Sequence, residues 1–242
     1  MVQLDRATIA TDAAPLAALV YSPAVRRFRS PALLSHGLTA SKESLDLLAG
    51  YLCGRGHACV TFDFRGHKLG ASAGDMNSIG DALADLAHAA AWARERWNEP
   101  QCVLIGHSMG ALVSLASPSR GVPAEAVVAV ATGVAPSRGF RGPVGQALMR
   151  QRGDYVSGVG PQALLKEMDA LADTLIVPQE TPALLVGARN DVLMKPARVA
   201  ELARRIGPTV ELAEVDAGHL DAPDAARGLI AAWLERKCVR LP

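Results

Sequence analysis

The chain has 242 residues, of which half are hydrophobic, and its formal net charge at pH 7 is +1. This length is ordinary for one α/β domain, and the low aromatic content, 4%, predicts a core of Ala, Val and Leu. The small net charge gives no argument for binding to nucleic acid or to a membrane surface. No run of apolar residues approaches the ~20 that a membrane-spanning segment needs, so no such segment is expected.

The amino terminus and the cysteines bear on the compartment. No basic segment followed by an apolar one opens the chain, so the pattern of a secretory leader is missing. The four cysteines show no metal-ligand spacing, and Cys59 and Cys102 fall in runs that predict buried strands. Such residues are most simply interpreted as small core thiols in a reducing cytosol. We therefore expect a cytoplasmic protein.

Strand patterns and helix patterns alternate along the chain. Most of the strand patterns are apolar throughout, which is typical of a parallel sheet covered by helices on both faces. The predicted strands are Gln3–Ile9, Leu16–Tyr21, Ala32–Ser35, His57–Phe64, Gln101–Ile105 and Ala126–Ala131, followed by one near Leu184–Gly187 and one ending before His219. The predicted helices are Ser41–Cys53, one that begins after Ser78 and stops before Pro100, one from Ala111, Pro196–Ile206 and Asp221–Lys237. Ser78 and Asp81 stand in capping-box spacing.

Residues 106–110 read G-H-S-M-G and stand between the strand Gln101–Ile105 and the helical stretch Ala111–Ala116. A G-x-S-x-G sequence between a strand and a helix is typical of a nucleophile elbow. The glycines let the strand and the helix approach closely, and the Ser108 hydroxyl is held at the carboxyl end of a sheet above a helix N-terminus. The sequence therefore predicts Ser108 as a nucleophile.

Other stretches share features with a known superfamily. Leu33–Leu38 is an apolar strand that ends in a His-Gly turn, and Val60–His67 contains D-x-R-G. Leu184–Asp191 and Glu214–His219 each look like a strand ending in a loop, the first with an acid and the second with a histidine. With the elbow, these stretches resemble the α/β-hydrolase superfamily over nearly the whole chain. The order Ser, Asp, His is the order that this superfamily uses.

The resemblance implies a single α/β-hydrolase domain over residues 1–242, with a mostly parallel, doubly wound sheet of about eight strands. The first stretch is similar to the oxyanion loop of the superfamily, and the second to the D-x-R-G-x-G-x-S stretch of its esterase-like and lysophospholipase-like members. This chain departs from that stretch, because two additional residues precede the last glycine, Gly70. We expect Asp63 and Arg65 to tie loops together and Lys42 to be exposed to solvent.

The segment Gly133–Glu180 separates two predicted strands by more than a connecting helix requires. By resemblance, α/β-hydrolases insert a lid here, and we expect a small helical one. An amphipathic stretch within it carries Leu164, Met168 and Leu171 on one face with no obvious partner. The segment also carries four arginines, Arg138, Arg141, Arg150 and Arg152. They are interpreted as a solvated face, with the alternative of a landing site for the phosphate of coenzyme A or phosphopantetheine.

Residue roles follow from the chemistry of a serine nucleophile, which needs a base to accept its proton. His219 is the predicted base, and Asp191 is the acid that orients it. Two backbone N–H groups should stabilise the oxyanion, those of Leu38 and Met109. His36 is expected to shape the oxyanion loop. The expected substrate contacts are His36, Leu164 and Met168.

Alternatives to these assignments remain open. Asp216, three residues before His219, and Asp173, in the lid segment, could replace Asp191 as the orienting acid. His107 precedes the nucleophile and is expected to pack beside it. An epoxide hydrolase is excluded by residue type, because that chemistry on this scaffold needs an aspartate in place of Ser108.

The sequence thus predicts a serine hydrolase that cleaves a small-molecule carboxylic ester or thioester through an acyl-enzyme, with no metal and no organic cofactor. A carboxylesterase or lysophospholipase-like enzyme is the first choice. A discrete thioesterase or acyltransferase of a biosynthetic pathway is the enzymatic alternative. The alternative from another class is a ligand-binding protein that kept the fold and lost turnover. The acyl length, the leaving group and the oligomeric state are left open.

Overall fold

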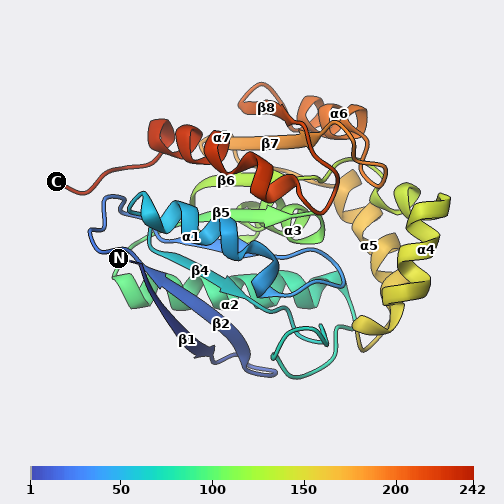
Figure 1. Ribbon diagram of the computed structural model, residues 1–242, viewed down its shortest axis with the longest axis horizontal. Helices are drawn as coiled ribbons and strands as arrows, with labels where there is room; N and C mark the ends of the chain where they lie inside the picture. Colours follow the sequence, from blue (N-terminus) through green and yellow to red (C-terminus); the bar gives the residue numbers. More distant parts are fainter. Residues whose placement is uncertain (1) are drawn as a thin grey trace.

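A computed structural model describes residues 2–242 and places helices on both faces of one eight-stranded sheet (Figure 1). The strands are β1 (Gln3–Ile9), β2 (Leu16–Ser22), β3 (Ala32–Ser35), β4 (Cys59–Phe62), β5 (Cys102–His107), β6 (Ala124–Val130), β7 (Ala183–Ala188) and β8 (Val210–Val215). Their spatial order is β1-β2-β4-β3-β5-β6-β7-β8. Strands β3 to β8 run parallel to one another, and β2 is antiparallel to both β1 and β4. The predicted α/β-hydrolase architecture is confirmed in its sheet.

The helices that connect the strands divide between the two faces. They are α1 (Asp46–Gly54), α2 (Ile79–Trp97), α3 (Met109–Ala116), α6 (Pro196–Ile206) and α7 (Ala222–Lys237). Short 3₁₀ turns are η1 (Lys42–Leu45) and η2 (Pro118–Arg120). Helices α1 and α7 share one core cluster, whereas α2, α3 and α6 share the other.

Adjacent strand residues explain this arrangement, because successive side chains point to opposite faces of a sheet. Leu33 of β3 and Leu104 of β5 belong to the core under α2 and α3, whereas Leu34 and Ile105 belong to the core under α1 and α7. The inner strands are therefore apolar at nearly every position, as the sequence pattern indicated.

The site-bearing edge of the sheet is set by a crossover. The chain moves from β3 outward to β4 and then returns past β3 to β5. Helix α1 covers one face on the way out, and α2 covers the other face on the way back. The loops that leave the carboxyl ends of β3 and β5 therefore diverge to opposite faces, and α/β proteins commonly bind ligands at such a point of the sheet.

Element boundaries differ from the predicted ones in a few places. The bounds of β1, β3 and α6 agree with the sequence prediction, and the capping box of Ser78 and Asp81 is present. The helix predicted over Ser41–Cys53 begins instead as the 3₁₀ turn η1 before it becomes α1. Lys42 in that turn is buried, contrary to expectation, because its ammonium group lies 2.7 Å from the fully buried carboxylate of Asp63.

The segment between β6 and β7 contains η3 (Pro136–Arg141), α4 (Pro143–Arg152), η4 (Gly153–Tyr155) and α5 (Pro161–Asp173). In Figure 1 these elements stand together at one end of the sheet. Residues after η4 pair with the loop that follows β4, through the bridges His67–Val156 and Met76–Gly158. The segment is thus joined to the site-bearing edge of the sheet by backbone hydrogen bonds.

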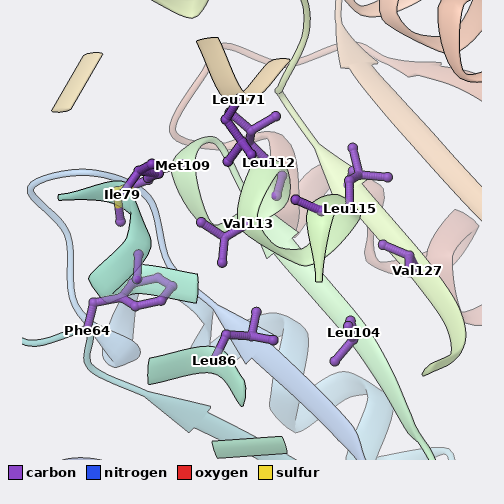
Figure 2. Packing of buried hydrophobic residues seen from close by; sticks show 14 of the residues in the cluster. Phe64, Ile79, Leu86, Leu104, Met109, Leu112, Val113, Leu115, Val127 and Leu171 are labelled. Carbon is purple, nitrogen blue, oxygen red and sulfur yellow. The ribbon is translucent and has the colours of Figure 1, made fainter. Parts of the chain in front are cut away.

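Helix α5 packs against α3 and α2. Its residues Leu164, Met168 and Leu171 are at most 5% exposed and belong to the same core cluster as Leu112 of α3. Figure 2 shows Leu171 and Leu112 within this cluster. The expectation that this face of α5 lacks a partner is therefore wrong, because the connection between the strands folds it onto α3.

All four cysteines are buried and unpaired among the described residues. Cys59 and Cys102 lie on β4 and β5, as the sequence predicted. Within residues 2–242, none of the helices is long and apolar enough to cross a bilayer.

Candidate active site

The turn between β5 and α3 holds Ser108 in an unusual backbone conformation. Its φ is 53° and its ψ is −113°, in a region that L-residues rarely adopt. A Cβ atom on Gly106 would lie 2.3 Å from the backbone of Gly110, and one on Gly110 would lie 2.3 Å from the carbonyl oxygen of Ser35. Only glycine fits at both positions. The observed turn is the elbow geometry that the G-x-S-x-G pattern predicts.

The backbone around Ser108 is fixed on both sides. Its N–H donates to the carbonyl of Val130 on β6 at 2.9 Å, and its own carbonyl accepts from Leu112 at 3.2 Å. The hydroxyl thus stands at the N-terminus of α3, where the helix dipole favours negative charge. Within residues 2–242 no hydrogen bond joins this hydroxyl to His219, and such bonds in ligand-free enzymes often tighten only when substrate binds.

Asp191 and His219 meet at the carboxyl ends of β7 and β8. The Nδ1 atom of His219 lies 2.6 Å from Oδ2 of Asp191, and the Asp191 side chain is fully buried. The other carboxylate oxygen accepts the backbone N–H groups of Leu193 and Met194, at 2.8 and 2.7 Å. These bonds fix the carboxylate, so that His219 keeps its proton on Nδ1 and presents Nε2 as an acceptor.

The two alternative acids have other partners. Asp216 is exposed and accepts a hydrogen bond from the Asn190 amide at 2.8 Å. Asp173 lies at the end of α5, where its carboxylate pairs with Arg205 at 3.2 Å. Of the three candidate acids, Asp191 is the one that bonds to His219.

The loop after β3 lies directly against the elbow. A Cβ atom on Gly37 would come within 3.2 Å of the Ser108 Cβ, and the Gly110 N–H donates to the His36 carbonyl at 3.1 Å. The backbone N–H groups of Leu38 and Met109 have no hydrogen-bond partner in residues 2–242. Free donors beside a nucleophile are what an oxyanion hole requires.

His36 fixes the orientation of this loop. Its Nε2 accepts the Phe64 N–H at 3.1 Å, so its Nδ1 must carry the proton and donate to the Gly37 carbonyl at 2.8 Å. Since the C=O and the N–H of a trans peptide point in opposite directions, this bond turns the Leu38 N–H away from His36. Burial lowers the pKa of His36 to about 4, which keeps the ring neutral near pH 7. His36 has no exposed surface, which favours a role in shaping the loop, and a contact with substrate stays a prediction.

His107 makes a contact that the sequence prediction missed. Its Nε2 donates to the backbone carbonyl of His219 at 2.9 Å, and the two imidazole rings are 5.0 Å apart. Burial lowers the pKa of His107 to about 3, so the ring is neutral. The G-x-S-x-G pattern places a residue at the end of β5 but contains no signal for what that residue reaches across the sheet.

The loop after β4 is built around two buried carboxylates. Asp63 accepts the backbone N–H groups of Lys42 and Ala71 as well as the Lys42 ammonium group. The Arg65 guanidinium donates two hydrogen bonds to the fully buried carboxylate of Asp85 on α2. The expectation that Asp63 ties loops together is confirmed, whereas Arg65 ties its loop to α2. Gly70 lies directly against the Asp63 carboxylate, since a Cβ atom on Gly70 would clash with it. The two additional residues that precede Gly70 in this loop therefore do not displace it from Asp63.

The expected substrate contacts Leu164 and Met168 are buried at 0% and 2% exposure in the core between α5 and α3. Their burial favours a role in packing, and a contact with substrate stays a prediction for both. Residues 2–242 contain no group of three or more His, Cys, Asp or Glu side chains that could hold a metal ion.

Comparisons with known proteins bear on the family and the fold of the chain. The family model for serine aminopeptidase, S33, matches residues 28–175. A search of curated protein sequences found no match. Among solved structures, an esterase of Pyrococcus furiosus is similar at 22% identity, with 98% of this chain and 92% of the other covered and a TM-score of 0.74.

Two further structures show the same fold. An α/β serine hydrolase without a lid from Xanthomonas campestris is 19% identical, with 99% and 97% of the two chains covered and a TM-score of 0.72. The esterase domain of a Rhodothermus marinus protein is 24% identical, with 97% and 98% covered and a TM-score of 0.70.

Proposed function

Because the chain belongs to the serine aminopeptidase S33 family of α/β hydrolases, we propose that it cleaves carboxylic esters through an acyl-enzyme on Ser108. The observation that carries this proposal is the 2.6 Å bond between Asp191 and His219, on the same sheet edge as the elbow. A buried acid that holds a histidine beside a serine elbow is the arrangement of a catalytic triad.

The proposed chemistry begins with attack of the Ser108 oxygen on the carbonyl carbon of the ester. The serine proton passes to Nε2 of His219, and the imidazolium that forms is stabilised by Asp191. The carbonyl oxygen becomes negative and accepts hydrogen bonds from the N–H groups of Leu38 and Met109, each worth roughly 3 kcal/mol of transition-state stabilisation. His219 then returns the proton to the leaving alcohol as the C–O bond breaks.

Water completes the cycle. His219 removes a proton from a water molecule, whose oxygen attacks the acyl carbon, and the same oxyanion donors act again. Collapse of the second tetrahedral intermediate returns the proton to the Ser108 oxygen and releases the carboxylic acid. The reaction consumes one water per ester and leaves the protein unchanged.

An ester is preferred over a thioester because the similar structures in Pyrococcus furiosus and Rhodothermus marinus are named esterases. A thioester would pass through the same steps with a thiol as leaving group. We further propose that the segment of residues 133–180 borders the site as a small lid, because its backbone pairs with the loop after β4 and Gly139 packs against Leu193 near Asp191.

The test is a substrate panel of p-nitrophenyl acetate, p-nitrophenyl butyrate, and matched oxygen esters and thioesters of graded acyl length. Hydrolysis by the wild type with loss in Ser108→Ala, at an unchanged circular dichroism spectrum, is the expected result. Faster turnover of thioesters than of oxygen esters of equal length would favour the thioesterase alternative. Saturable binding without turnover of any ester or thioester would favour the ligand-binding alternative and contradict the proposal.

A further inference from the structure

A cavity of about 480 Å³ lies among η3, α4 and α5, outside the catalytic residues. Figure 1 shows α4 and α5 next to each other at the end of the sheet. Each of the three elements contributes three residues to the lining. They are Ser137, Phe140 and Arg141 from η3, Gln146, Met149 and Arg150 from α4, and Gln162, Leu165 and Lys166 from α5.

The two helices present matched faces to this cavity. Residues 146, 149 and 150 of α4 have the spacing i, i+3, i+4, and residues 162, 165 and 166 of α5 have the same spacing. Such positions share one helix face. Each face supplies one glutamine, one apolar residue and one cation, so the cavity is lined on both sides by the same chemistry.

The cavity is open because α4 is not packed into the core. Gly145 is the one buried residue of α4, and the helix packs on η3 and η4. Leu165 is 4% exposed and forms an apolar floor, and Phe140 and Met149 are partly buried beside it. The interior can therefore accept an apolar group of modest size.

The cationic side chains of the cavity are not paired with acidic side chains among the described residues. Within residues 2–242 the side chains of Arg141, Arg150 and Lys166 make no salt bridge and no hydrogen bond, and no carboxylate lines the cavity. The nearby carboxylates of α5 form no ion pair with these cations, since Glu167 accepts the Ile79 N–H and Asp169 accepts from Ser137. The three cations that line the cavity itself, around an apolar floor, favour an anion there.

We propose that this cavity binds a small amphipathic acid, a molecule with an aliphatic body and a carboxylate or phosphate head. The body would lie on Leu165, Phe140 and Met149, and the head would be held by Arg150 and Lys166, with the glutamines as additional donors. Arginine matches the geometry of both head groups because its guanidinium donates paired hydrogen bonds. The site does not depend on the proposed ester hydrolysis, because none of its lining residues belongs to the triad or the oxyanion loop.

The experiment is calorimetric titration with octanoate, octyl phosphate, 1-octanol, acetate and inorganic phosphate. Octanoate and octyl phosphate are expected to bind at one site per chain, whereas 1-octanol, acetate and inorganic phosphate bind much more weakly. Comparison of the two acids identifies which head group the site prefers. Raising the salt from about 0.05 M to about 0.5 M should weaken binding of the acids and leave that of 1-octanol unchanged.

The variant Arg150→Gln/Lys166→Gln should weaken octanoate binding about tenfold, since it removes two charged contacts at a partly exposed site. The matched control is Arg152→Gln/Arg204→Gln, which removes the same charge from α4 and α6 outside the cavity and should bind octanoate normally. Met149→Ser should reduce the preference for octanoate over acetate. Protein with Ser108 phosphonylated should bind octanoate as well as free protein does.

Several outcomes would overturn the proposal. Equal weakening by the cavity variant and the matched control would mean that net charge alone is responsible. Loss of binding upon phosphonylation of Ser108 would place octanoate in the catalytic site as a product, whatever the fate of the proposed hydrolysis. Cosedimentation with phosphatidylglycerol vesicles, without binding of monomeric octanoate, would mean that this basic face adsorbs to lipid surfaces instead.

Discussion

His107 donates a hydrogen bond from Nε2 to the backbone carbonyl of His219, at 2.9 Å. His107 ends β5, directly before the proposed nucleophile. His219 lies in the loop after β8, which is three strands away from β5 in the sheet. The bond ties the loop of the proposed base to the strand that carries the proposed nucleophile. His107 is a positioning residue in this account, because it acts through His219 and is buried.

We expect His107→Leu to lower kcat about 10- to 100-fold with little change in KM, because a misplaced base affects the transition state more than substrate binding. His107→Gln should retain most of the activity, since its side-chain amide can donate from a similar position. Steady-state kinetics on p-nitrophenyl butyrate measure both variants. A parallel loss in the Leu and Gln variants, matched by an equal loss of thermal stability, would mean that His107 only fills space.

Exchange of the candidate acids separates their roles. Asp191→Asn should lower kcat by up to about 10⁴-fold, the loss known for a protease whose orienting aspartate was replaced. Asp216→Asn should retain most activity, because Asp216 is exposed and bonds to Asn190. Both variants are compared by kcat on the same ester. A nearly inactive Asp216→Asn beside an active Asp191→Asn would transfer the role of orienting acid to Asp216.

Truncation of α5 distinguishes packing from substrate contact. Leu164→Ala and Met168→Ala should each destabilise the protein by about 2–5 kcal/mol, because both side chains are buried in the core with α3. Urea denaturation gives this free energy of unfolding. If packing is their only role, rates on acetate and long-chain esters change in proportion. A selective loss on long-chain esters, with stability unchanged, would show instead that these side chains contact the acyl chain.

Four buried histidines make the free energy of unfolding depend on pH. Burial lowers the pKa of His36 and His57 to about 4 and of His67 and His107 to about 3. The unfolded chain takes up protons below pH ~6.5, whereas the folded chain does not until the pKa of each buried ring is reached. The contribution of these neutral rings to the free energy of unfolding is therefore fully present above pH ~6.5. It is lost as the pH falls towards the folded-state pKa values of about 4 and 3.

His57 offers the clearest test of this effect. Both of its ring nitrogens lack a hydrogen-bond partner among the described residues, and the ring stacks on Phe28 at 3.8 Å, away from Ser108. His57→Leu should remove on the order of 3 kcal/mol of the stability loss between pH 6.5 and pH 4. Urea denaturation across this range measures the difference from wild type. The same pH dependence in both proteins would mean that His57 takes up its proton as readily in the folded state as in the unfolded state, which contradicts a lowered pKa.

Much of the fold could be predicted from local patterns. The inner strands are apolar at nearly every position because both faces are covered. G-H-S-M-G specifies its own turn because Gly106 and Gly110 admit no side chain. The position of Asp191 and His219 at one edge of the sheet was also predictable, because each follows a strand of a parallel sheet, whose carboxyl ends share that edge. These features depend on residues close to one another in sequence.

Features that depend on distant residues were missed. Lys42 was expected in solvent, because nothing near it in the sequence shows that the Asp63 carboxylate will lie beside it. The partner of Leu164 and Met168 is α3, about 50 positions earlier in the chain. The bond from His107 to His219 joins residues more than 100 positions apart, and no pattern in one sequence encodes it.

Covalent labelling is the most direct measurement of the central claim, that Ser108 is an activated nucleophile. An alkyl fluorophosphonate should add one phosphonyl group per chain by mass spectrometry, and peptide mapping should place it on Ser108. Labelling should be lost in Ser108→Ala, which should keep the wild-type circular dichroism spectrum, and should be strongly slowed in Asp191→Asn. A label on any other serine, or full esterase activity in Ser108→Ala, would contradict the account.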